Sequence, residues 1–298
     1  WPMFVPGGFM PARCARRTWR RRNWRRSRFG QIVDIYLDHN ATTPVRPEVL
    51  DAMTAALAQT GNPSSVHRFG RLARRMLDDA RESVAQLVDA RGPNVIFTSG
   101  GTEANNLALL GFGDHALVSA VEHESVLAPR PDATIIPVDH NGVVNLDQLR
   151  TLLARQDGRV VVSVMLANNE TGVLQPVRDV AALASEFGAL VHCDAVQGAG
   201  KTPLSLPYLG VDLLTLSAHK IGGPQGVGAL VMRDGLDPDP LLRGGGQERR
   251  RRAGTENVPG IAGFGAAARL AADGLSSFAE LKILRDGMEA RLADAVSD

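Results

Sequence analysis

The segment VDLLTLSAHKIGGP, residues 211–224, joins a predicted strand to a lysine and a turn. Its apolar run, residues 211–216, is typical of a buried strand and leads directly into Ser217-Ala-His-Lys220. Burial at the end of a strand lowers the pKa of a lysine and makes its amine a usable nucleophile. A lysine that merely closes a strand at the surface is the alternative, and the residues after the neighbouring strands decide between the two.

Apolar runs alternate with segments of helical spacing along most of the chain, which predicts a mostly parallel sheet covered by helices on both faces. The fold class is therefore α/β. The predicted strands are residues 35–37, 95–98, 116–119, 133–137, 159–165, 190–193, 211–216 and 227–232. The predicted helices are residues 47–59, 70–87, 102–110, 146–154, 177–187, 258–272 and 276–296.

The 298 residues are enough for one large core and part of a second domain. No apolar run approaches the roughly 20 residues that a membrane span needs, so no membrane association is expected. Cys14 and Cys193 form no disulfide framework, which favours a reducing compartment and a cytoplasmic location.

Residues 1–33 differ from the remainder, because they hold nine arginines and no acidic residue. The rest of the chain then carries a net charge of −8 against +1 for the whole. We expect a disordered or non-native extension here, with an organelle presequence or a nucleic-acid-binding arm as alternatives. The acidic remainder gives no general affinity for nucleic acid.

Polar residues follow the predicted strands, at the edge of a parallel sheet where ligands bind. After residues 95–98, the turn Ser99-Gly-Gly-Thr102 opens a helix. Its free N–H groups and the helix dipole favour an anion, and Thr102 adds a hydroxyl. A helix cap with glycines for the turn is the other interpretation.

Single residues after other predicted strands each allow a structural and a functional interpretation. His123 suits a helix cap, or a ring that stacks and moves protons. Asn168 and Asn169 suit a turn, or hydrogen bonds to a ring substituent. Asp194 is costly to bury after an apolar strand unless it has a cationic partner, and Lys220 follows 26 residues later.

Together these residues meet the requirements of pyridoxal 5'-phosphate. Lys220 supplies an amine for the Schiff base with the aldehyde, and Asp194 keeps the ring nitrogen protonated. His123 supplies a flat group for the ring face. The phosphate site would comprise Gly101, Thr102, Ser217 and His219, and the donors to the phenolic oxygen would be Asn169 and Gln197. Walker and Rossmann fingerprints and zinc-ligand spacing are absent from the sequence.

Eight stretches carry a resemblance to the cysteine desulfurases, in the class V aminotransferase-like branch of pyridoxal phosphate enzymes. They are YLDHNATTP (36–44), GNPSSVHRFG (61–70), FTSGGTEANNLAL (97–109), EHESV (122–126), NNETGVLQP (168–176), HCDAVQ (192–197), SAHKIGGPQGVGAL (217–230) and GGGQERRRRAGTENV (244–258). The resemblance runs from about residue 34 to residue 298.

The resemblance implies a fold-type I transferase with a seven-stranded-type sheet sandwiched by helices. Its cofactor-binding large domain would occupy residues 34–262, and residues 263–298 would begin a truncated C-terminal small domain. It implies that Lys220 and His123 are catalytic. Thr255 would reach the phosphate of a neighbouring subunit, which implies a homodimer.

By the same resemblance, the reaction converts L-cysteine to L-alanine and passes sulfur to an enzyme cysteine as a persulfide. The sulfur would serve iron–sulfur cluster or thio-cofactor assembly through an acceptor or scaffold protein. The persulfide cysteine and an arginine for the substrate carboxylate are expected beyond residue 298. We therefore expect the chain to bind cofactor with negligible desulfuration.

Cys193 is expected to be a small buried hydrophobe and not a substitute nucleophile. Alternatives to a desulfurase are a selenocysteine lyase, a class V aminotransferase, or a non-catalytic fragment that binds pyridoxal phosphate. The arginine run, residues 249–252, is expected to be a solvated face, with interface pairing as the alternative.

Overall fold

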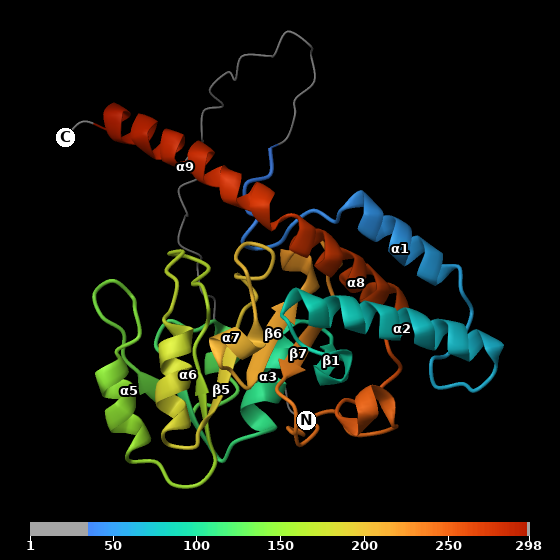
Figure 1. The fold of residues 1–298 in the computed structure, drawn as a ribbon, viewed down its shortest axis with the longest axis horizontal. Coiled ribbons are helices and arrows are strands. Elements are labelled where there is room, and N and C mark those ends of the chain that lie inside the picture. The colour runs from blue at the N-terminus through green and yellow to red at the C-terminus, as the bar shows by residue number, and fades with distance from the viewer. Residues whose placement is uncertain (1–34, 297–298) are drawn as a thin grey trace, which may run out of the picture. The chain divides into compact units, whose positions relative to one another are not determined.

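Seven strands form one mixed sheet in the computed structural model, which describes residues 35–296 (Figure 1). The strand order is β1-β7-β6-β5-β4-β2-β3. The strands are β1 (Val95–Thr98), β2 (His115–Ser119), β3 (Thr134–Ile136), β4 (Val160–Ser163), β5 (Leu190–Asp194), β6 (Leu213–Ser217) and β7 (Gly228–Met232).

Strand direction brings the important loops to one edge of the sheet. β3, β2, β4, β5 and β6 are parallel neighbours, whereas β7 runs antiparallel to both β6 and β1. β1 therefore points the same way as β6. The carboxyl ends of β1, β2, β4, β5 and β6 share one edge, and the segments that follow them meet there.

Helices cover both faces of the sheet, and each face has its own apolar core. Alternate strand residues belong to different cores: Ile96 and Leu213 to one, Phe97 and Leu214 to the other. The helices are α1 (Pro47–Leu57), α2 (Arg68–Leu87), α3 (Gly101–Leu110), α4 (Glu124–Leu127), α5 (Leu146–Leu153), α6 (Val177–Ser185), α7 (Leu206–Leu209), α8 (Val258–Asp273) and α9 (Leu275–Ala295), with short 3-10 turns η1 (Gly92–Asn94), η2 (Ala218–Lys220) and η3 (Gln247–Arg250).

The smaller core lies under α3, whereas α2, α6 and α8 contribute to the larger one. α8 packs against both α1 and α2 (Figure 1). Phe264 of α8 is fully buried and meets Phe97 edge-on at 6.3 Å between ring centroids. This contact anchors the helix over the strand that leads into the predicted anion-binding turn.

The predicted α/β fold with a mostly parallel, seven-stranded sheet is confirmed. The strand predicted at residues 35–37 is wrong, because Ile35–Leu37 forms no ladder and its side chains are exposed. β4 also ends at Ser163, short of the predicted residue 165. The N–H of Met165 turns to the side chain of Glu122, although the N–H groups of Val164 and Leu166 still donate to β5.

The chain divides into two units between residues 37 and 38. Of the first, the structure describes the extended residues 35–37, so the predictions for residues 1–33 and for Cys14 lie outside the described residues. The predicted domain boundary after residue 262 falls within α8 and stays a prediction. Within residues 35–296, no helix is long and apolar enough to cross a membrane.

Candidate active site

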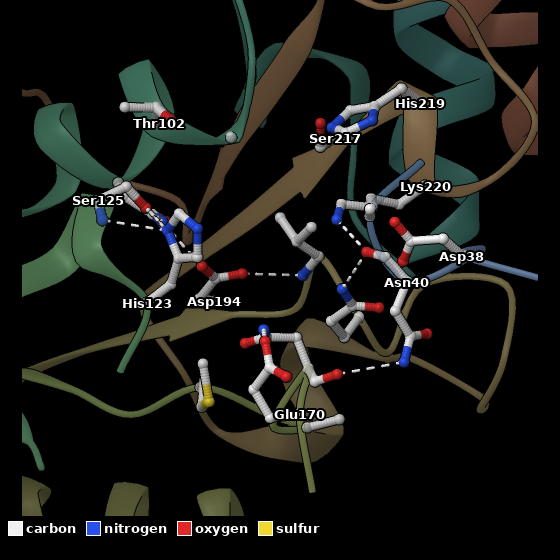
Figure 2. A pocket seen from close by; sticks show the side chains of 18 residues that line it. Asp38, Asn40, Thr102, His123, Ser125, Glu170, Asp194, Ser217, His219 and Lys220 are labelled. Atoms are coloured by element: carbon white, nitrogen blue, oxygen red, sulfur yellow. Dashed lines mark hydrogen bonds between the residues drawn. The ribbon is translucent and has the colours of Figure 1, made fainter. Parts of the chain in front are cut away.

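A cavity of about 760 Å³ opens at the carboxyl edge of the sheet (Figure 2). Nine of the ten predicted site residues line it: Gly101, Thr102, His123, Asn169, Asp194, Gln197, Ser217, His219 and Lys220. Thr255 does not line it and borders a separate cavity of about 150 Å³. The fold therefore brings nine of the predicted residues to one cavity, and the tenth lies elsewhere in this single chain.

Lys220 lies in η2, directly after β6, and its amine faces the cavity (Figure 2). Its Nζ donates to the backbone carbonyl of Asn40, which also accepts from Nε2 of Gln197 at 2.9 Å. Burial lowers the pKa of Lys220 although the charges of Asp194 and Asp38 act in the opposite direction. The lowered pKa raises the fraction of free amine at neutral pH, as a nucleophile requires.

Asp194 ends β5, with 6% of its surface exposed. Its carboxylate accepts from Nδ2 of Asn105 at 2.7 Å and from the N–H of Val196 at 3.0 Å. Burial raises the pKa of Asp194, although these two hydrogen bonds and the nearby charges of His123 and Lys220 oppose the rise. The carboxylate is thus held by neutral donors, in a position where a cation would stabilise its ionised form.

His123 caps a helix, and its ring also lines the cavity. Its Nδ1 accepts from the backbone N–H of Ser125 at 3.1 Å, which caps α4. Because Nδ1 is an acceptor there, the neutral ring carries its proton on Nε2. Figure 2 shows the ring between Ser125 and Asp194.

The turn before α3 has the features of an anion site. No side chain caps α3 at Gly100, so the first N–H groups of this ten-residue helix are available to a ligand. The turn is tight at Gly101, where a Cβ would lie 3.1 Å from Cγ2 of Val196 and 3.5 Å from Cβ of Ser217. A side chain at this position would therefore press on Val196, just after β5, whereas Ser217 of β6 lies at an ordinary contact distance.

The two predicted ring-side amides already have protein partners. Oε1 of Gln197 accepts from Lys201 at 2.7 Å, and its Nε2 donates to Asn40. Nδ2 of Asn169 donates to Glu170 at 2.7 Å. Each NH2 group has two N–H donors and these bonds use one of them, so the second N–H of either amide can still donate to a bound ring. Asn168 is the turn residue, because its Oδ1 accepts from the N–H of Glu170 at 2.9 Å.

Glu122 is a buried carboxyl group that sequence reasoning missed. Its Oε1 accepts from Oγ of Ser119 at 2.8 Å and from the N–H of Met165 at 2.6 Å. These bonds tie the segment after β2, which carries His123, to the segment after β4. Burial raises the pKa of Glu122 to about 8, and the charge of Asp194 adds to the rise.

Asn40 and Asn105 were also missed. Asn40 belongs to the polar loop after residue 37, and its side chain donates to the carbonyl of Asn169 at 3.2 Å. Asn105 lies on the buried side of α3, where its Nδ2 also donates to Ser125 at 2.9 Å. A polar residue on an otherwise apolar helix face was the available signal for Asn105.

Two further predictions are settled by burial and pairing. Cys193 is fully buried in the core, and burial raises its pKa well above the usual thiol value, so the expectation of a buried hydrophobe is confirmed. The solvated interpretation of the arginine run is wrong in part. Arg251 pairs with Asp237 at 2.6 Å and Arg252 with Glu103 at 2.8 Å.

The aminotransferase class-V family matches residues 35–292, and the chain belongs to that family. The cysteine desulfurase IscS of Dictyoglomus turgidum is 45% identical over 253 residues, covering 80% of this chain. The chain spans 64% of that relative's length.

Solved structures of similar proteins were also found. The NifS-like protein from Rickettsia africae is 38% identical with a TM-score of 0.84, covering 87% of this chain and 75% of that one. A structure described as SspA in complex with cysteine is 32% identical with a TM-score of 0.73, covering 78% and 72%.

Proposed function

We propose that the chain is the cofactor-binding part of a cysteine desulfurase that uses pyridoxal 5'-phosphate. The carrying observation is one cavity that holds the amine of Lys220, the buried carboxyl of Asp194 and the uncapped start of α3. The names of the relatives support the reaction, and the structure of SspA with cysteine supports an amino-acid substrate of this kind.

The donor set fits the cofactor in charge. The start of α3 suits a phosphate, with Ser217 and His219 beside it. Asp194 suits a protonated ring nitrogen, because a cation there would return the raised pKa of its carboxyl toward the ordinary range. Bound pyridoxal phosphate supplies an aldehyde that captures amines and a ring that accepts the electron pair left at the Cα of an amino acid.

The residues of this chain would bind, orient and move protons. Lys220 would provide the amine that holds the cofactor aldehyde, and its Nζ would be the base for the Cα proton of a bound amino acid. His123 offers Nε2 as the site that holds or gives a proton, since Ser125 occupies Nδ1. Asn105 orients Asp194 through its 2.7 Å hydrogen bond.

The sulfur acceptor is a separate requirement. Among residues 35–296, Cys193 is the lone cysteine, and its buried thiol with a raised pKa is neither accessible nor ionised. The described residues thus support substrate activation and leave the persulfide step to another thiol.

The proposal includes a homodimer, a sulfur-acceptor or scaffold partner for iron–sulfur assembly, and a cytoplasmic location. The resemblance implies that Thr255 reaches the phosphate of a neighbouring subunit, and its position outside the main cavity agrees with that role. The resemblance to cysteine desulfurases supports the other two.

Exchange of the Cα proton for deuterium tests the proposal. The cofactor-loaded protein is incubated with L-alanine or L-cysteine in deuterated water, and nuclear magnetic resonance measures the loss of the Cα proton signal. We expect exchange in the wild type, none in Lys220→Ala, and little sulfide release. Absence of exchange despite cofactor binding indicates a non-catalytic protein. Formation of a keto acid indicates an aminotransferase, and a selective reaction with selenocysteine indicates a lyase.

A further inference from the structure

The arginine loop, defined as residues 247–252, has an unusual backbone. Glu248, Arg249 and Arg250 have φ angles of 42°, 57° and 69°. Non-glycine residues rarely adopt this left-handed region, and they remain there only where surrounding contacts hold them. Three in succession indicate that both ends of the loop are firmly anchored.

The first anchor is the carboxylate of Glu248, which is 6% exposed. It accepts from the two terminal nitrogens of Arg81 at 2.6 and 2.7 Å, and from the backbone N–H of Phe97 at 3.0 Å. Phe97 lies in β1, just before the turn that leads into α3. The loop thus holds the strand on the amino-terminal side of that turn.

The second anchor is Arg252, which holds the other side of the same turn. Its Nε donates to Oε1 of Glu103 at 2.8 Å and its Nη2 to Oε2 at 3.3 Å. Glu103 lies in the first turn of α3, and its Oε2 accepts from the backbone N–H of Ser99 at 2.7 Å. The turn between Phe97 and Glu103 is therefore clamped at both ends by the arginine loop.

The negative charge of Glu103 lies at the start of α3, and Arg252 balances it. Burial acts to raise the pKa of Glu103, but the hydrogen bonds from Arg252 and Ser99 outweigh it and lower that pKa. Glu103 is thus anionic at neutral pH, beside the helix start where a phosphate would bind. An anion repels a phosphate dianion at short range unless a cation compensates it.

We propose that the arginine loop positions the phosphate-binding turn, and that Arg252 neutralises Glu103 so that the turn accepts a phosphate dianion. The inference rests on the proposed function, since the phosphate is that of the cofactor. Arg252 is a positioning residue here: it acts on the ligand through Glu103.

Equilibrium titrations followed by absorbance test the proposal. They measure the affinity of each protein for pyridoxal 5'-phosphate and for pyridoxal, which lacks the phosphate. The proteins are the wild type, Arg252→Gln, Glu103→Gln and the double variant. We expect Arg252→Gln to bind the phosphorylated cofactor about tenfold more weakly, which equals about 1.4 kcal/mol, while its affinity for pyridoxal stays unchanged. The double variant should recover most of the loss.

Arg150→Gln is the matched control, because Arg150 of α5 makes a similar two-bond pair, at 2.8 and 3.1 Å, with Glu186 just after α6. Urea unfolding checks that each variant folds. An unchanged affinity of Arg252→Gln for the phosphorylated cofactor overturns the proposal, as does an equal loss for pyridoxal. Failure of the double variant to recover overturns the neutralisation. If the wild type binds neither compound, the proposed function itself fails.

Discussion

Replacing Glu122 with glutamine isolates the effect of a buried carboxyl group that is hydrogen-bonded to Met165, a residue of the cavity wall. Glu122 is 7% exposed, and its pKa rises from 4.5 to about 8 in the folded chain. Between these two values the folded state holds a proton that the unfolded state has released. Glutamine keeps Oε1 as the acceptor for Ser119 and for Met165 but has no proton to lose.

The direction of the pH dependence follows from linkage. A pKa raised in the folded state gives stability that is complete below the unfolded pKa and is lost as pH rises through the folded pKa. For a shift from 4.5 to about 8, the free energy of unfolding of the wild type should fall by about 3 kcal/mol, relative to Glu122→Gln, between about pH 5.5 and pH 9.

Urea unfolding of both proteins at several pH values between these limits, without added cofactor, measures the difference. Glu186→Gln is the control, because Glu186 is exposed and its pKa is lowered, chiefly by the hydrogen bond from Arg150. Its curve should run parallel to that of the wild type over this range. If the curves of the wild type and Glu122→Gln also run parallel, Glu122 ionises normally and the argument from burial is refuted.

Three further substitutions test other parts of the structure. Burial lowers the pKa of His192 to about 3. Lowering the pH from about 7 to 5 should therefore reduce the free energy of unfolding of the wild type, measured in urea, by about 2 kcal/mol relative to His192→Gln, and equal losses in both proteins would contradict this. Arg81→Ala leaves the carboxylate of Glu248 buried without its partner and should cost about 3–5 kcal/mol by the same assay, whereas a loss below about 1 would contradict a buried pair. Gly101→Ala places a Cβ 3.1 Å from Cγ2 of Val196. It should lower the free energy of unfolding by about 1–3 kcal/mol and weaken cofactor binding, whereas unchanged binding would show that the turn has room for a methyl group.

The predicted site residues lie close together in the structure for a physical reason that the sequence already contains. The carboxyl ends of neighbouring parallel strands meet at one edge, so polar residues after successive apolar runs are brought together. Asp194 and Lys220 follow β5 and β6, which are adjacent in the sheet. Their proximity follows from order along the chain, without any knowledge of side-chain contacts.

Residues that act over long sequence separations were missed. Asn40 reaches Lys220 across 180 positions, and nothing in its own loop indicates that its carbonyl accepts from that amine. Glu122 was missed because its neighbour His123 offered a more familiar chemistry, and its burial depends on the packing of the segment after β4. The arginine run looked solvated because the partners of Arg252 and Arg251 lie in distant segments.

Short apolar runs were the weak point of the fold prediction. Residues 35–37 have the composition of a strand, but three residues make few ladder hydrogen bonds and they form none here. The antiparallel direction of β7 was not predicted, because a parallel and an antiparallel buried strand have the same apolar pattern.

The most direct test of the central claim is to identify the lysine that binds pyridoxal phosphate. The sequence has three lysines, Lys201, Lys220 and Lys282, so borohydride reduction of the loaded protein and peptide mass spectrometry can distinguish them. We expect one reduced adduct, on Lys220, and the loss of both this adduct and the visible absorption band in Lys220→Ala. An adduct on Lys201, whose amine lies beside Gln197 in the same region, or an undiminished adduct in the variant, would contradict it.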